Sequence, residues 1–136
     1  MINYGERAAE LFADGYNCAQ SVAGAFAEKF GIELDVMTKL ASSFGGGMAG
    51  TRGVCGAVSG MLMVAGLAKG YCDPEAKAEK QEHYALCRKL MDEFSAENGS
   101  VVCSELLAMH KSGEKTRKSC GELCRMAADI VAKYID

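Results

Sequence analysis

Residues 45–60 read GGGMAGTRGVCGAVSG and hold seven glycines and one cysteine. The glycine-rich first part disfavours a regular helix, whereas the second part opens an apolar run over residues 54–68. That run is hydrophobic nearly all round, which is typical of a helix buried at the centre of a domain. It is broken by glycines and is shorter than the roughly 20 residues of a membrane span. We therefore expect a central buried helix and no membrane association.

Segments with helical spacing of their apolar residues flank this run on both sides. They cover residues 7–13, 17–30, 34–44, 74–96, 101–110 and 119–135, with a polar, lysine-rich loop over residues 111–118. Asp73-Pro74 is a typical helix start and Asn98-Gly99 a typical stop. The pattern predicts an all-α fold, a compact bundle of six or seven helices around a central Gly-rich buried helix. At this length we expect a single domain over residues 1–136.

Charge and composition exclude several classes of function. The chain carries a formal charge of −3 and no basic stripe, so no electrostatic feature indicates binding to nucleic acid or to a membrane surface. The first residues lack the layout of a signal peptide, and we expect a cytoplasmic protein. The pattern Gly45-x-Gly47-x-x-Gly50 matches a dinucleotide-binding motif, but it follows a predicted helix rather than a strand. We therefore do not expect nucleotide binding there, whether through this motif or through Arg52.

Seven cysteines form the most informative feature of the composition. An odd number without a secretion signal argues against a disulfide framework and favours metal, cluster or thiol redox chemistry. Four of them share one setting, the first turn and apolar face of a predicted helix: Cys18, Cys55, Cys103 and Cys120. Free N–H groups and the helix dipole stabilise a thiolate there. Four such helix ends would hold a metal or an iron–sulfur cluster; the alternative is that each cysteine is simply a small buried hydrophobe.

The other three cysteines are expected to be structural or bystanders. Cys124 lies on the same helix face as Cys120 and could also reach a metal, but its deeper position favours packing. Cys87 is expected in the core, with His83 as a structural histidine on the same stripe, and Cys72 in a loop. No CxxC motif is present, so neither a zinc ribbon nor a thioredoxin-type dithiol is indicated. The absence of CxxCH likewise predicts no covalent haem.

Two glycines are predicted to support the site through the backbone. Gly47, in the segment 45–53, permits a positive φ and a close approach to the site near Cys55. Gly56 leaves room beside a cysteine sulfur and, together with Gly60, gives a flat face for close helix packing. Packing alone is the simpler interpretation of Gly56 and Gly60.

Several motifs together resemble the C_GCAxxG_C_C family of redox-active proteins. They are GYNCAQSV (15–22), FGGGMAG (44–50), CGAVSG (55–60), VVCSELL (101–107) and CGELCRMAADIV (120–131), and they extend over nearly the whole chain. The family is named for four shared cysteines, which correspond by position to Cys18, Cys55, Cys103 and Cys120. Cys120 is preferred to Cys124 because the family places an Ala-Ala pair seven and eight residues after its last cysteine, here Ala127-Ala128.

Together, the cysteines and the resemblance predict one four-cysteine site. We expect it to bind a metal, most plausibly an iron–sulfur cluster, for electron transfer or redox sensing with a redox partner protein. Two alternatives stay open. One is a thiol-disulfide oxidoreductase without metal, and the other is a non-enzymatic helical domain with a structural zinc or buried free thiols. Glycine-flattened helix faces are also compatible with a homodimer.

Overall fold

The computed structural model describes residues 2–111 and 119–135. This part of the chain forms seven α-helices and one short 3₁₀ helix: α1 (Tyr4–Ala13), α2 (Cys18–Ala25), α3 (Leu34–Ala41), η1 (Ser42–Phe44), α4 (Gly56–Lys69), α5 (Lys77–Asn98), α6 (Cys103–Lys111) and α7 (Cys120–Ile135). Between the described residues the only β-type pairing is an isolated bridge that joins Val54 to Val102. The predicted all-α fold is confirmed. Of the loop predicted for residues 111–118, Lys111 belongs to α6 and the rest lies outside the described residues.

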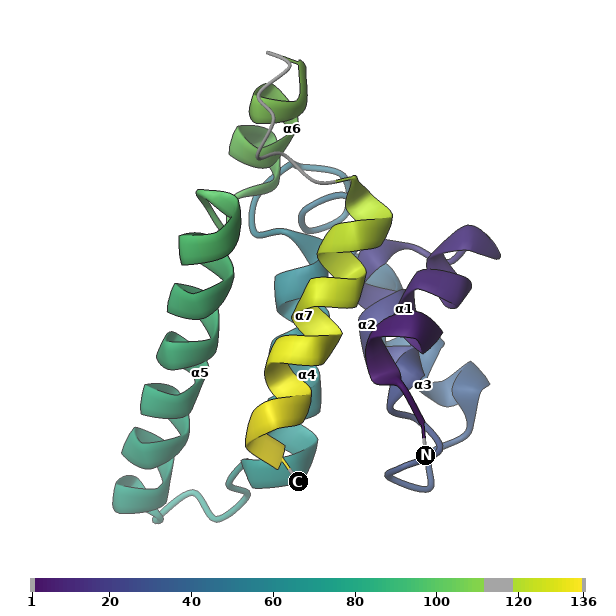
Figure 1. Cartoon of the computed structure of the whole chain (residues 1–136). Coiled ribbons are helices and arrows are strands. Elements are labelled where there is room, and N and C mark those ends of the chain that lie inside the picture. The colour runs from purple at the N-terminus through teal and green to yellow at the C-terminus, as the bar shows by residue number, and fades with distance from the viewer. Residues whose placement is uncertain (1, 112–118, 136) are drawn as a thin grey trace.

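The helices are arranged around α4 and α7, which run side by side through the middle of the molecule (Figure 1). Helix α5 covers one side of this pair, α1 to α3 lie on the other, and α6 stands at one end. The largest fully buried side chains include Phe26, Met61 and Phe94, so α2, α4 and α5 share one core. Helix α4 is the predicted central Gly-rich helix.

Glycines let α2 lie directly against α4. A Cβ atom at Gly60 would stand 2.8 Å from the carbonyl oxygen of Ala19 and 2.9 Å from Cβ of Val22. One turn earlier, a Cβ atom at Gly56 would stand 3.0 Å from Cβ of Cys18. All three distances are shorter than ordinary van der Waals contact, so only glycine fits at these two positions without a shift of the backbones. This close packing brings the start of α2 next to the start of α4.

The start of α2 is fixed by a capping box. The Asn17 side chain accepts a hydrogen bond from the backbone N–H of Gln20, and the Gln20 side chain accepts one from the N–H of Asn17. The predicted helix over residues 17–30 is too long, because α2 ends at Ala25. The amides of Phe26 and Ala27 donate to carbonyls only three residues back, which tightens the chain into turns.

The start predicted for α5 at Asp73-Pro74 is also wrong, since the helix begins at Lys77. The Asp73 carboxylate accepts a hydrogen bond from the N–H of Glu75 at 2.9 Å, which closes a local turn instead of capping a helix. The predicted stop is confirmed: Gly99 adopts a left-handed φ of 93°, and its N–H donates to the carbonyl of Ser95.

None of the helices in the described ranges combines the length and the apolar character that a membrane span requires.

Candidate functional site

Four cysteines from four different helix starts line one small cavity of about 60 Å³. This volume exceeds the 10–15 Å³ or so that a single water molecule requires. The remaining lining comes from the segment 45–53, from Gly56 of α4 and from apolar residues of α6 and α7. The lining residues are Cys18, Gly46, Gly47, Arg52, Cys55, Gly56, Cys103, Leu106, Leu107, Cys120 and Leu123. We call this space the four-cysteine cavity.

Each of the four cysteines occupies the start of its helix, as the sequence predicts. Cys18, Cys103 and Cys120 are the first residues of α2, α6 and α7, and Cys55 is the N-cap residue of α4. The first N–H groups of a helix have no partner within the helix, and the dipole places partial positive charge at that end. Four positive helix ends therefore surround the cavity, and they favour negative charge on the sulfurs.

The glycine-rich segment is joined to the start of α6 by backbone hydrogen bonds. The N–H of Cys103 donates to the carbonyl of Gly53 at 2.7 Å, and the N–H of Ser104 donates to the carbonyl of Arg52 at 3.1 Å. On the other side of the Val54–Val102 bridge, the N–H of Cys55 donates to the carbonyl of Val101 at 2.8 Å. Cys55 and Cys103, which are distant in sequence, are thus held at neighbouring positions by the backbone.

Gly47 occupies the tightest point of this arrangement. Its φ is 71°, in the left-handed region, and the residue is buried. A Cβ atom here would stand 2.7 Å from Cβ of Cys103 and 2.8 Å from Cα of Arg52. The amides of residues 48–53 all donate to carbonyls of residues 43–48. Gly46 and Gly47 line the cavity, and among the described residues their N–H groups donate no backbone–backbone hydrogen bond. Any side chain at Gly47 would therefore push the segment away from Cys103.

Ionisation of the Cys18 and Cys55 thiols is unfavourable in the cavity. A hydrogen bond with Cys120 lowers the pKa of Cys18, but a hydrogen bond with Cys124, burial and the charges of Cys124 and Cys55 raise it well above its ordinary value. Burial raises the pKa of Cys55 and outweighs the opposing amides of Ala57 and Val58. Because neighbouring thiolates oppose the ionisation of Cys18 and Cys55, positive charge in the cavity would favour the ionised forms of these two thiols.

Cys120 and Cys124 occupy different environments. Cys120 lines the four-cysteine cavity, whereas Cys124 is completely buried and does not line it. The Cys124 thiol donates to the backbone carbonyl of Cys18, with sulfur and oxygen 3.8 Å apart, so it packs behind Cys18 in the core. Of these two cysteines, Cys120 therefore lies at the four-cysteine cavity and Cys124 lies behind it.

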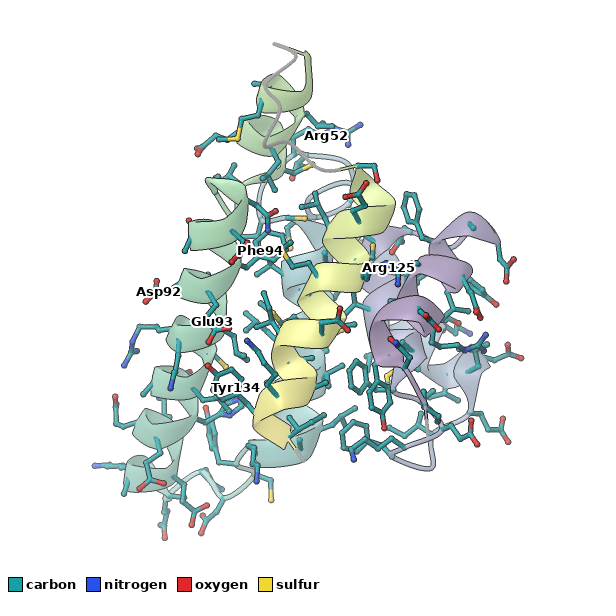
Figure 2. The ribbon with its side chains drawn as sticks, in the orientation of Figure 1. Arg52, Asp92, Glu93, Phe94, Arg125 and Tyr134 are labelled. Carbon is teal, nitrogen blue, oxygen red and sulfur yellow. The ribbon has the colours of Figure 1, made fainter. Side chains whose placement is uncertain are left out.

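Arg52 is a cavity residue that the sequence analysis did not assign to the site. Its Nη1 atom lies 3.8 Å from the sulfur of Cys103. In Figure 2 it lies at the end of the molecule next to α6, away from Glu93 and Tyr134 on the α5 side. The available signal was an arginine three residues before Cys55 in a stretch otherwise made of small and apolar residues.

A second thiol contact lies outside the cavity. The sulfur of Cys87 is 3.5 Å from Nε2 of His83, one turn earlier on α5, and Nδ1 of His83 is buried without a hydrogen-bond partner. Cys87 is only half-buried, so its predicted core position is wrong, while Cys72 is exposed as expected of a loop residue. The four-residue spacing of a histidine and a cysteine on one helix would have predicted this pair.

The donor set fits soft metal chemistry, because cysteine thiolates are the ligands of iron–sulfur clusters. In the ranges 2–111 and 119–135, however, no three Cys, His, Asp or Glu side chains are placed to hold a single metal ion. The larger cavity, about 690 Å³ between α5 and α7, contains no cysteine; its lining includes Glu93, Arg125 and Met126. The four helix-start cysteines thus line the small cavity and not this larger one.

The geometry defines a helical protein with four cysteines around one cavity. The sequence profile described as "Putative redox-active protein (C_GCAxxG_C_C)" matches residues 16–134, and the chain belongs to this family. A protein of Archaeoglobus fulgidus, named only as "Uncharacterized protein", is 31% identical over 132 residues, which cover 91% of this chain and 87% of that protein. No solved structure is significantly similar to the chain.

Proposed function

We propose that the four-cysteine cavity is a redox centre that binds an iron–sulfur cluster and exchanges electrons with a redox partner protein. The observation that carries the proposal is the position of Cys18, Cys55, Cys103 and Cys120 around one cavity, each at the start of a different helix. Isolated structural cysteines have no reason to share both a cavity and a helix position.

The electrostatics of the cavity support a cationic occupant. A hydrogen bond with Cys120 lowers the pKa of Cys18, but a hydrogen bond with Cys124, burial and neighbouring charges raise it, and burial raises the pKa of Cys55. These two thiols therefore stay protonated in the metal-free protein. A metal deprotonates the thiols that ligate it and supplies the missing positive charge. The helix ends and the backbone of Gly46 and Gly47, which line the cavity, then lie next to the negative charge that four thiolates bring. Such a cluster supplies one-electron transfer when bound.

A cluster suits the cavity better than a single zinc ion does. Four thiolates bound to zinc at about 2.3 Å would stand about 3.8 Å from one another. In the described ranges, no three potential ligands converge on one ion position. A cluster with several metal atoms binds its cysteines through different metal atoms, so it does not require three sulfurs around one ion position.

A second candidate function rests on the contact between Cys18 and Cys120. Their side chains are hydrogen-bonded, so the two sulfurs are neighbours. In a metal-free protein these two thiols would be oxidised to a disulfide by a disulfide of the redox partner protein. The partner's sulfurs would accept both electrons and both protons and leave as two thiols.

Replacement of single cysteines distinguishes the functions. The protein, purified without oxygen, is assayed for iron, zinc, acid-labile sulfide and visible absorbance. Cys55→Ser should lose iron, sulfide and colour, whereas Cys87→Ser, which alters a thiol outside the cavity, should retain them. Equal metal content in both variants would refute the shared site. A metal-free parent with a reversible Cys18–Cys120 disulfide would establish the second candidate instead.

A further inference from the structure

Arg52 occupies a backbone conformation that arginine rarely adopts. Its φ is 64°, in the left-handed region where glycine and asparagine are favoured. The backbone is held there from both sides: the N–H of Arg52 donates to the carbonyl of Gly46 at 3.0 Å, and its carbonyl accepts from Ser104. Such strain persists at positions where the side chain contributes something that an unstrained residue would not.

The guanidinium group is what the Arg52 side chain contributes at this strained position. It lines the four-cysteine cavity, and its Nη1 atom lies 3.8 Å from the sulfur of Cys103. Met48 and Ala49 have comparable φ values, 70° and 54°, in the same segment, but neither lines the cavity. Among the described residues no carboxylate forms an ion pair with Arg52. Arg52 is exposed to solvent, and the cavity sulfur that its guanidinium group contacts is that of Cys103.

We propose that Arg52 is a positioning residue that sets the reduction potential of the four-cysteine centre. The inference rests on the proposed cluster function. Reduction adds one electron from the redox partner protein to the centre, which becomes one unit more negative, and no proton is required. A fixed positive charge beside the Cys103 sulfur stabilises the reduced state more than the oxidised state. Arg52 therefore raises the reduction potential.

The test is an anaerobic redox titration of the cluster-loaded protein, followed by its visible spectrum. Arg52→Asn removes the charge while suiting the left-handed backbone, and Arg52→Gly does the same if the asparagine variant does not fold. Arg52→Lys retains the charge, and Ala49→Gly relieves comparable strain without changing any charge. Iron and sulfide are measured for each variant, because a purely structural role would alter cluster content rather than potential.

We expect Arg52→Asn and Arg52→Gly to lower the reduction potential by about 59 mV. For one electron, this shift corresponds to about a tenfold change in the redox equilibrium constant. Arg52→Lys should retain most of the parental potential, and Ala49→Gly should match the parent. An unchanged potential in a fully loaded, uncharged variant would overturn the inference and leave the proposed function intact. Loss of the cluster from that variant would also overturn it, since Arg52 would then be needed for assembly. A parent protein without any cluster would refute the proposed function and this inference together.

Discussion

Two groups of cysteine residues in this protein have opposite surroundings. The sulfurs of the four-cysteine cavity come from separate segments, lie at helix starts and are approached by glycine backbone. Cys87 lies within α5, and its sulfur contacts His83, one turn earlier on the same helix. Burial raises the pKa of Cys87 as it does that of Cys55, so a raised pKa does not separate the two groups. Convergence of thiols from distant parts of the chain does separate them, and the proposed cluster site rests on this convergence.

The largest expected effect concerns the glycines rather than the cysteines. Gly47→Ala places a Cβ atom 2.7 Å from Cβ of Cys103 at a left-handed φ. We expect a loss of about 2–3 kcal/mol of unfolding free energy together with loss of bound metal. Gly66→Ala is the matched control, because no atom lies within 4 Å of its Cβ position in α4. Chemical denaturation should show this variant to be more stable than the parent by about 0.5–1 kcal/mol. Equal stability of the two variants would contradict the account of Gly47.

A pair of variants separates stability from function on α7. Cys124→Ala removes a completely buried sulfur and should cost about 1 kcal/mol of unfolding free energy, with metal content retained. Cys120→Ala removes a cavity sulfur and should abolish metal binding, with little effect on the stability of the metal-free protein. Denaturation of the metal-free variants and metal analysis of the purified ones measure the two effects. Metal loss in the Cys124 variant alone would make Cys124 the fourth ligand.

The thiols of the cavity also predict a pH dependence. The pKa of Cys18 is raised above the ordinary thiol value of 9.0, so the folded state keeps a proton that the unfolded state loses. The metal-free protein should therefore lose stability as the pH rises above about 9, by at most about 1.4 kcal/mol per pH unit for each such thiol. Below that pH Cys18 should contribute no slope. Cys18→Ala should reduce the slope in alkaline denaturation, and Cys72→Ser, at an exposed thiol, should not.

The smallest effect is expected on the α5 side of the molecule. Glu93 accepts hydrogen bonds from Tyr134 and from Lys133, which also pairs with it at 3.1 Å (Figure 2). The hydrogen bond from Tyr134 and the Lys133 charge keep the pKa of Glu93 below its ordinary value. Any stabilisation is thus present at neutral pH and is lost as the pH falls through that lowered pKa. Because the pair is exposed, the change in unfolding free energy caused by Glu93→Gln should be too small to detect by chemical denaturation in about 1 M salt. The metal content of this variant should equal that of the parent.

Local sequence patterns predicted the helices and the helix-start position of Cys18, Cys55, Cys103 and Cys120, because caps and glycines act over a few residues. One error arose where a side chain had a competing local bond, since Asp73 closes a turn with Glu75 instead of starting α5. The grouping of the four cysteines was predicted from their shared helix-start position and the family resemblance. That Arg52 joins them was not predicted, because it depends on backbone hydrogen bonds between the segment 45–53 and α6. Contacts between segments so far apart in sequence leave no periodic signal.

The most direct test of the central claim is the iron, zinc and acid-labile sulfide content of the parent protein, purified without oxygen, with its visible spectrum. The account predicts iron and sulfide in comparable amounts, little zinc and a brown absorbance that bleaches on reduction. A colourless protein with neither iron nor sulfide after cluster reconstitution would contradict it. Titration of the Cys18 and Cys120 thiols would then decide between disulfide exchange and a structural role.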